Sequence, residues 1–323
     1  MDKHDEIAEK TGYDVQVVAI TTGSRGALVC EQGIDLAWAM QEIETKGRFD
    51  PEGAHFSTMD SMAVIRTVDY DAMLELTPIN IYTGQPAIDH IKTAMNRGRH
   101  VISANKGPIA WAFQELNDLA KEKGVCFYYE TTVMAGTPLF NMADNCLQYC
   151  KISEIRGILN ATTNYVLEEM TKGIPMAEIM ENGKKGGFME ADPSMDMKGW
   201  DAAAKLTSLM NVLMDANMTP DRIDRVGIEE VTPEEIRQAE AEGCKIKLLC
   251  HGRIENGAVV GTVKPTKLPK EHPFCGSDVV AAVSLDTDLM GKVTVIQYGL
   301  ETTQTGYGVF IDLIRVLQNA PRK

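Results

Sequence analysis

The first third of this 323-residue chain alternates short apolar runs with longer amphipathic segments, and this alternation constrains the fold more than any other feature. Four runs are short and largely apolar, as buried strands are: residues 15–21, 72–76, 100–103 and 125–129. Helical segments lie between them, notably at residues 86–97 and 108–121. Strands that alternate with helices predict a parallel sheet with helices on both faces, the doubly wound arrangement of the α/β class.

After about residue 130 the pattern changes to helices and hairpin signals. Helices are predicted at residues 138–150, 163–172, 176–184, 200–215 and 307–317. Antiparallel strands are predicted at residues 245–263, around the turn Glu255-Asn256-Gly257, and again at 278–286 and 292–298. We therefore expect two domains: residues 1–132, completed by a C-terminal helix in 305–323, and an α+β domain in residues 133–304.

Charge and cysteine content exclude several classes of protein. With 32 basic against 46 acidic residues the net charge is −14, which would repel a nucleic-acid backbone. No apolar run approaches the roughly 20 residues that span a bilayer, and the charged opening residues are no signal peptide. The seven cysteines contain no C-x-x-C pair. Cys146 and Cys150 are spaced like a metal pair, but without further ligands nearby we favour reduced structural thiols and a cytoplasmic protein.

The strongest concentration of reactive side chains lies between residues 187 and 205. Asp192-Pro193 favours an extended or turn conformation, so residues 190–199 are predicted to form a loop. Asp201 and Lys205 are four residues apart on the next helix and share one face. A lysine oriented by a carboxylate can exchange a proton with a substrate hydroxyl, while the loop carboxylates can receive an ammonium group. The alternative interpretation is a solvated acidic loop followed by a surface ion pair.

This segment resembles the homoserine dehydrogenase signature, in which E-x-D-P leads through an acidic position to G-x-D and a lysine four residues later. Other segments resemble the family in the same order: residues 76–78 (L-T-P), 103–108 (S-A-N-K-G-P), 130–138 (E-T-T-V-M-A-G-T-P) and 157–165 (G-I-L-N-A-T-T-N-Y). The resemblance runs from about Asp5 to Leu317. It implies a Rossmann-type nucleotide-binding domain and a second domain for catalysis and dimerisation, with a homodimer formed through the strands of residues 245–298.

The resemblance also implies an activity and a set of roles. The reaction would be the reversible NAD(P)-dependent oxidation of L-homoserine to L-aspartate 4-semialdehyde, in the biosynthesis of threonine and methionine. The catalytic residues would be Lys205, which exchanges the hydroxyl proton, Lys106 and Asp201. The substrate would be bound by Glu190, Asp196, Thr162 and Phe188. A sodium ion would be enclosed, mostly by backbone carbonyls, at Glu130, Val133, Ala135 and Thr137, a hard-oxygen set that does not suit zinc.

Cofactor binding is implied at several separate positions. By resemblance, the cofactor would contact Thr77, Pro78, Asn105, Ala161, Gly299 and Thr305. The run at residues 15–21 is followed by Ser24 and Arg25 and by no acidic residue that could bond a ribose 2′-hydroxyl. Ser24 and Arg25 suit a 2′-phosphate, which favours NADP over NAD. The alternative is that Arg25 is only a surface turn residue, and for Lys106 it is a charged residue at a strand end.

Three departures from the family pattern concern the cofactor side. No G-x-G-x-x-G turn precedes residue 15, so the first strand–turn–helix unit is missing and residues 2–10 read as part of its helix. Glu301 stands where the family has glycine in a G-x-G-A-x-x-T-A loop. Ala161 replaces a glycine, and Phe188 a tyrosine found in some members. These changes leave two alternatives open: a dehydrogenase for another small hydroxy-amino acid, or a non-catalytic homologue with a degraded cofactor site.

Overall fold

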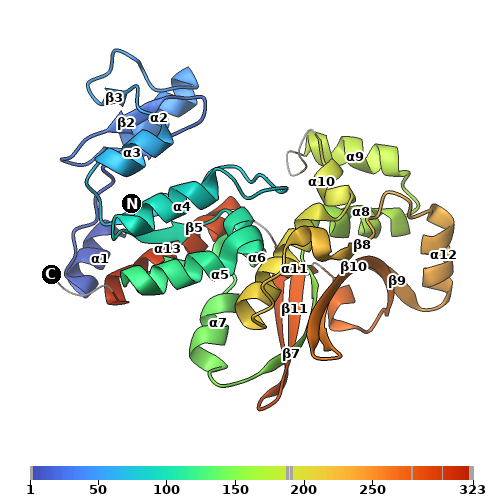
Figure 1. The fold of residues 1–323 in the computed structure, drawn as a ribbon. Coiled ribbons are helices and arrows are strands. Elements are labelled where there is room, and N and C mark those ends of the chain that lie inside the picture. The colour runs from blue at the N-terminus through green and yellow to red at the C-terminus, as the bar shows by residue number, and fades with distance from the viewer. Residues whose placement is uncertain (1–2, 187–188, 190–191, 278, 300, 320–323) are drawn as a thin grey trace.

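The computed structural model of the chain describes residues 3–186, 189, 192–277, 279–299 and 301–319. Three sheets organise these residues, and each sheet packs with its own helices around a separate hydrophobic core (Figure 1). A small sheet forms a lobe at one end, a parallel sheet lies in the middle, and a six-stranded sheet forms the other half of the molecule. Among the described residues no helix combines the length and apolar character needed to cross a membrane.

The parallel sheet in the middle of the molecule is the one that the alternating pattern predicts. Its strands, in spatial order, are β4 (Ala72–Glu75), β5 (His100–Ser103) and β6 (Phe127–Tyr128). The helices beside it are α4 (Ala87–Asn96), α5 (Lys106–Lys123) and α13 (Thr302–Asn319). Val101 belongs to the core that β5 shares with α4 and α5. Ile102 is equally buried and points to the opposite face, where α13 lies, so both faces of the sheet are covered.

The prediction that residues 15–21 form a buried strand of this parallel sheet is wrong. Only β1 (Ala19–Thr21) is a strand, it is half-buried, and it pairs antiparallel with β2 (Ala27–Val29) in the small lobe. The backbone carbonyls of Val17 and Val18 accept hydrogen bonds from Ile34 and Cys30, so residues 17–21 pair with the chain that follows them. The run is apolar and includes a strand, as predicted, but that strand pairs with its neighbour in a local hairpin and not with a strand of the parallel sheet.

The small lobe is completed by a third strand and two helices, and a further helix precedes it. These elements are β3 (Phe56–Ser57), α2 (Leu36–Lys46), α3 (Ser61–Thr67) and α1 (His4–Thr11). Asp35 and Asp60 begin α2 and α3, because each carboxylate accepts backbone N–H groups that the first helical turn leaves unpaired. Leu28 and Phe49 lie in the core of the lobe.

The second half of the molecule is built on a six-stranded sheet of order β12-β11-β7-β9-β10-β8. The strands are β7 (Ile152–Ile158), β8 (Asp224–Arg225), β9 (Cys244–Glu255), β10 (Ala258–Pro269), β11 (Val279–Thr287) and β12 (Gly291–Tyr298). The predicted hairpin is confirmed: Asn256 and Gly257 have φ values of +52° and +80° and connect β9 to β10. Two positive φ values in a two-residue turn match the twist of the strands, which explains why Asn-Gly stands there.

β7 lies in the interior of the sheet and was not predicted from the sequence. Buried Ile152, Ile155 and Ile158 recur every three residues, which resembles a helical period more than the period of two that a strand shows. Ile155 and Ile158 lie on opposite faces of the sheet, in separate cores. The interval from Ile152 to Ile155, which share one core, is accounted for by a register shift in the pairing with β11, between Asp286 and Thr287. Such a bulge rotates one part of a strand relative to the next and so breaks the alternation of its side chains.

The helices of the second half lie on and around the six-stranded sheet. They are α6 (Thr131–Met134), α7 (Leu139–Cys146), α8 (Ala161–Thr171), α9 (Met176–Lys185), α10 (Ser194–Met197), α11 (Trp200–Leu213) and α12 (Pro233–Ala241), with short 3₁₀ turns at Pro220–Arg222 and Pro273–Cys275. The predicted loop at residues 190–199 therefore contains one helical turn, α10. α11 contacts both α5 and the six-stranded sheet, so its residues lie where the two halves meet (Figure 1).

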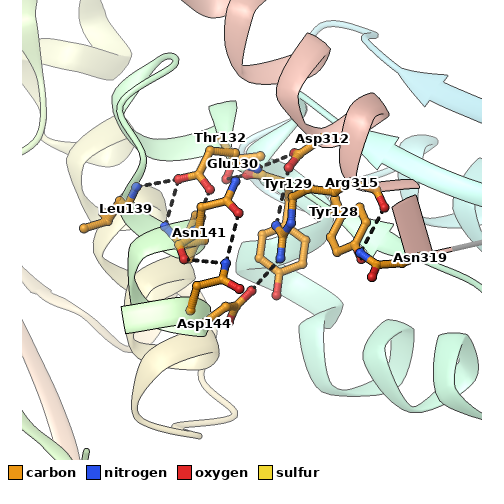
Figure 2. A network of polar contacts seen from close by, with 12 residues as sticks. Tyr128, Tyr129, Glu130, Thr132, Leu139, Asn141, Asp144, Asp312, Arg315 and Asn319 are labelled. Atoms are coloured by element: carbon orange, nitrogen blue, oxygen red, sulfur yellow. Dashed lines mark hydrogen bonds and ion pairs between the residues drawn. The ribbon is translucent and has the colours of Figure 1, made fainter. Parts of the chain in front are cut away.

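A buried polar network fixes α13 to the segment that follows β6 (Figure 2). Asp312 is fully buried, and its Oδ2 accepts a hydrogen bond of 2.8 Å from the backbone N–H of Glu130. Arg315 lies over the ring of Tyr128 and forms an ion pair of 2.9 Å with Asp144 of α7. α13 is thus held to the parallel sheet. The boundary near residue 132 remains a prediction.

We expect Asp312 to make the stability of the fold depend on pH. Burial raises the pKa of Asp312 to about 7, with a smaller contribution from the charge of Glu130. The folded state then binds more protons than the unfolded state between the ordinary aspartate pKa of 3.8 and about 7. Stability is therefore lost as the pH rises through this window. Asp312→Asn should remove a penalty on the order of 3 kcal/mol at pH 8 and have much less effect at pH 5.

Thermal unfolding of both proteins at the two pH values measures this difference. Asp144→Asn is the control, because Asp144 pairs with the same arginine but its side chain is 55% exposed. An Asp312→Asn protein whose Tm difference from the parent is the same at both pH values would contradict the prediction.

Candidate active site

Asp201 and Lys205 lie on one face of the first two turns of α11, as their spacing predicts. The helix begins after Gly199, whose φ of +73° lies in the left-handed region that glycine adopts most readily. Lys205 Nζ lies 2.9 Å from Asp201 Oδ2, and the two side chains are 17% and 14% exposed. Because both groups are largely withdrawn from water, their charges interact more strongly than those of a surface pair. The alternative of a solvated surface pair is therefore excluded by their burial.

Lys106 reaches the same carboxylate from the parallel sheet. It is the first residue of α5, separated from the end of β5 by two residues, and its Nζ lies 3.0 Å from Asp201 Oδ1. One carboxylate thus joins two lysines through separate oxygens. Burial by itself would raise the pKa of Asp201, but the charges of Lys106 and Lys205 outweigh it and hold that pKa well below its ordinary value. Asp201 is ionised at neutral pH and fixes both ammonium groups at the junction of the two halves.

The chain that follows β7 supplies two more contacts, which the sequence analysis did not assign. The backbone carbonyl of Leu159 accepts a hydrogen bond of 2.8 Å from Lys205 Nζ. The side-chain amide of Asn160 donates to Asp201 Oδ2, also at 2.8 Å. A backbone carbonyl has no signature in a sequence, so Leu159 was beyond sequence reasoning. Asn160 lay within the matching segment at residues 157–165, and its signal was its place before a helix.

Of the predicted substrate-binding residues, the structure describes Asp196 and Thr162. Asp196 Oδ1 accepts a hydrogen bond of 2.7 Å from Asn160, which places it beside the lysine-bearing group. Burial raises the pKa of Asp196, and the negative charge of Asp201 raises it further, against hydrogen bonds from Asn160 and Thr162 that lower it. Glu190 and Phe188 lie outside the described residues.

A cavity of about 290 Å³ opens beside the two lysines. It is lined by Ala104, Lys106, Thr131, Thr132, Val133, Met134, Ala135, Leu159, Ala161, Lys205, Val280, Ala281, Gln297 and Thr305. Both halves of the molecule contribute to this wall. A second cavity, of about 330 Å³, shares Gln297 with the first and is otherwise lined by Gly136, Thr137, Thr303, Gln304 and Tyr307. Together they provide space for a small polar molecule beside the ammonium groups and for part of a larger one next to it.

The predicted cofactor-facing residues Thr77 and Asn105 lie at the carboxyl ends of adjacent strands β4 and β5. The backbone N–H of Thr77 donates to the buried carboxylate of Glu75 at 2.9 Å, and its hydroxyl donates to the same oxygen. Asn105 donates from its amide to the carbonyl of Thr77 at 3.0 Å and begins α5 by accepting from Gly107. Pro78 follows and is exposed. Ligands of open parallel sheets bind at this edge, so the position suits a nucleotide.

Ser24 and Arg25 are placed in the turn between β1 and β2, and both are exposed. The turn is organised locally, since Arg25 donates its backbone N–H to Thr22 and accepts one from Phe49. Figure 1 shows this lobe set apart from β5 and α5, on the side of the parallel sheet away from α11. The structure therefore does not bring Ser24 and Arg25 together with the lysines.

The four residues predicted to enclose a cation lie between β6 and α7. Glu130 is buried, and its carboxylate accepts backbone hydrogen bonds of 2.5–2.8 Å from Leu139, Phe140 and Asn141 at the start of α7 (Figure 2). These contacts use both carboxylate oxygens. Val133 belongs to α6, and Thr137 donates its backbone N–H to Met134. No group of three acidic, histidine or cysteine side chains that could hold a metal occurs in the described part of the chain.

Ala135 has a backbone conformation that an alanine rarely adopts, with φ +46° and ψ −129°. A non-glycine residue in such a conformation persists only where its surroundings enforce it, and such residues cluster at functional sites. The surroundings that enforce the conformation of Ala135 are closely packed at Gly136 and Gly308. A Cβ on Gly136 would lie 2.3 Å from the carbonyl oxygen of Gln304, and one on Gly308 would meet Thr131. The turn after α6 and the first turns of α13 are therefore packed backbone to backbone.

The C-terminal segment in which Glu301 departs from the family pattern has a local structural role. Gly299 has a φ of +71°, and Thr305 accepts at its carbonyl a hydrogen bond of 3.1 Å from Thr131. Glu301 stands directly before α13, where it accepts from the Thr303 hydroxyl while its backbone N–H donates to Gln304. A negative charge at a helix N-terminus is favourable, and the hydrogen bond from the Glu301 backbone N–H to the Gln304 side chain is one half of a capping box. Glu301 is therefore accounted for as the start of α13.

Comparison with known proteins agrees with this architecture. The family profile described as homoserine dehydrogenase matches residues 138–314. The homoserine dehydrogenase of Methanocaldococcus jannaschii is 36% identical, over 99% of this chain and 94% of that protein. The NAD(+)-dependent homoserine dehydrogenase of Pseudomonas canavaninivorans is 33% identical, over 100% of this chain and 92% of that protein.

Solved structures show the same likeness in three dimensions. A hyperthermophilic archaeal homoserine dehydrogenase in complex with NADPH superposes with a TM-score of 0.82 at 28% identity, over 99% of this chain and 94% of that one. A homoserine dehydrogenase from Thiobacillus denitrificans gives 0.81 at 28% identity, over 97% of this chain and 68% of that one.

The fold and these relatives place the chain among the NAD(P)-dependent oxidoreductases, and two lysines meet one carboxylate at the junction of its two halves. Within that class the sequence and structural relatives agree on one family. The chain belongs to the homoserine dehydrogenase family.

Proposed function

We propose that this chain catalyses the reversible NAD(P)-dependent oxidation of L-homoserine to L-aspartate 4-semialdehyde, in the biosynthesis of threonine and methionine. The observation that carries the proposal is the joint contact of Lys106 and Lys205 with Asp201, at the wall of a cavity of about 290 Å³. Alcohol oxidation needs a group that takes the hydroxyl proton, and a fixed amine beside a small cavity can do so.

The chain's own residues would divide the work as follows. For the oxidation, the Lys205 ammonium group first releases one proton to solvent; the resulting amine then takes the hydroxyl proton of homoserine at Nζ and becomes ammonium again, while Asp201 and the Leu159 carbonyl hold that nitrogen in place. Lys106 places a second positive charge beside the oxygen that loses its proton. Asp196 receives the substrate ammonium group, together with Glu190, which the sequence analysis also assigns to the substrate. Thr162 and Phe188 complete the proposed substrate contacts. The bound nicotinamide supplies the hydride acceptor.

The described residues fit the nicotinamide end of such a cofactor. Thr77 and Asn105 lie at the carboxyl ends of two parallel strands, and Ala161 and Thr305 line the cavity beside the lysines. Pro78 and Gly299 belong to the same proposed set. The sequence contains no G-x-G-x-x-G turn, so the pyrophosphate contacts of that motif have no counterpart among these residues.

We propose NADP over NAD because Ser24 and Arg25 suit a 2′-phosphate. Arg25→Ala should then raise KM for NADP and leave KM for NAD unchanged.

Two further features belong to the proposal. We propose a sodium ion held by the backbone of the segment containing Glu130, Val133, Ala135 and Thr137, supported by the enforced conformation of Ala135. Replacing sodium with choline in the assay should then lower activity.

We also propose a cytoplasmic homodimer formed through the strands of residues 245–298. His251 and Arg253 of β9 point away from α11, to the sheet face that would meet the partner, and a monomeric mass in solution would refute this.

The reaction is tested by following nicotinamide absorbance with L-homoserine and either NAD or NADP. We expect turnover with homoserine and a lower KM for NADP. A panel of small hydroxy-amino acids serves as the control for substrate. Turnover of another member in preference to homoserine would replace the proposed substrate, and absence of turnover across the panel with both cofactors would contradict the proposed function.

A further inference from the structure

Asn160 joins two carboxylates that reach the site from different segments of the chain. Its amide nitrogen donates to Asp196 Oδ1 at 2.7 Å, on α10, and to Asp201 Oδ2 at 2.8 Å, on α11. The side chain lies at the start of α8 and is only 4% exposed. A primary amide has two N–H bonds, so each carboxylate can receive one of them.

The orientation of the amide is determined by the other end of the group. Asn160 Oδ1 accepts a hydrogen bond of 2.8 Å from the backbone N–H of Thr163, which begins α8. Rotating the amide by half a turn would set its nitrogen against that N–H and its oxygen against two carboxylates. Both changes are unfavourable, so the N-cap of α8 holds the two donors toward Asp196 and Asp201.

The two carboxylates differ in what stabilises their charge, and Asn160 donates a hydrogen bond to each of them. Asp201 is held by Lys106 and Lys205. Asp196 receives hydrogen bonds from the neutral side chains of Asn160 and Thr162; burial and the nearby charge of Asp201 raise its pKa, while these hydrogen bonds and the charge of Lys205 lower it. A buried carboxylate in that position favours its protonated form unless donors stabilise the charge. A protonated Asp196 would be a poor receptor for an ammonium group.

We propose that Asn160 is a positioning residue that keeps Asp196 ionised and at a fixed separation from Asp201, so that one carboxylate orients the lysines while the other receives the substrate ammonium group. The inference rests on the proposed function. The backbone contact of Leu159 with Lys205 comes from the adjacent residue, so the end of β7 aligns the proton-transfer group and the ammonium receptor together. Asn160 acts through the two aspartates and needs no contact with the substrate.

The test is the pair of variants Asn160→Ser and Asn164→Ser. Serine is as good a helix N-cap as asparagine, so Asn160→Ser keeps the start of α8 but cannot donate to both carboxylates. Asn164 is a buried amide on the same helix that bonds Val279 and Lys247, away from the site, and serves as the matched control for a structural role. We expect Asn160→Ser to raise KM for homoserine about tenfold, with a smaller change in kcat. The acid limb of its pH profile for kcat/KM should move to higher pH.

A readout without turnover separates this inference from the proposed reaction. Carboxyl carbon shifts of ¹³C-labelled aspartate, followed by NMR during a pH titration, report the ionisation of Asp196 directly. We expect the Asp196 pKa to rise by about one unit in Asn160→Ser and to stay unchanged in Asn164→Ser. An unchanged Asp196 titration in Asn160→Ser would reduce Asn160 to a helix cap and overturn the inference. A shifted titration in a chain that turns over no homoserine would uphold Asn160 and refute only the reaction.

Discussion

Lys205→Ala is expected to lower kcat for homoserine oxidation by about 10³-fold, because the group that takes the hydroxyl proton is removed. KM should change less, since the proposed ammonium contacts at Asp196 and Glu190 remain. The fold should tolerate the change, because Asp201 keeps Lys106 as its partner at 3.0 Å. Steady-state kinetics and thermal unfolding of the same preparation measure both effects.

Lys247→Ala is the matched control for this experiment. Lys247 is also a buried lysine of the second half, at 1% exposure, and it pairs with Glu168 and Asn164 away from the cavity. Its loss should lower the Tm and leave the kcat of the folded protein near that of the parent. Equal kinetic effects of the two substitutions would show that loss of folded protein, and not loss of proton transfer, explains the result for Lys205.

Asp201→Asn is expected to lower the free energy of unfolding by about 3 kcal/mol at pH 7 and kcat by about 10²-fold or more. The stability loss arises because two largely buried ammonium groups lose the carboxylate that compensates them. The catalytic loss arises because Lys205 is no longer held against the cavity. Urea unfolding and kcat measure the two effects. Asp118→Asn is the control, since its contact with Lys121 is exposed and long at 3.9 Å, and it should change stability by less than about 0.5 kcal/mol.

The stability effect of Asp201→Asn should depend on pH in a defined direction. The folded-state pKa of Asp201 lies well below its ordinary value of 3.8, after the lysines outweigh the effect of burial. The stabilisation is therefore fully present above the unfolded pKa and is lost as the pH falls through the folded one. The difference between parent and variant should stay constant from neutral pH to about pH 5 and shrink only below about pH 4. A difference that disappears near neutral pH would contradict this account.

Sequence reasoning reached the principal side chains of the site because their signals are local. Asp201 and Lys205 are one helical turn apart, and a helix keeps such residues on one face wherever it packs. Lys106 was harder to interpret, since a lysine at a strand end has an ordinary alternative explanation. Its contact with Asp201 crosses 95 positions of the chain, and only the packing of α5 on α11 produces it. The same holds for Leu159 and Asn160, which act through a backbone carbonyl and a cap geometry.

The sequence by itself determined the parallel β4–β6 sheet with its helices, the β9–β10 hairpin and the Asp201–Lys205 pair, because each follows from apolar periodicity, turn residues or helical spacing. The tertiary structure alone decided that residues 15–21 pair within a small antiparallel lobe and that β7 lies inside the second sheet. It also placed Lys106, Asn160 and Asp196 around one carboxylate. Strand partners and charge clusters of this kind depend on long-range packing, about which a local sequence pattern carries no information.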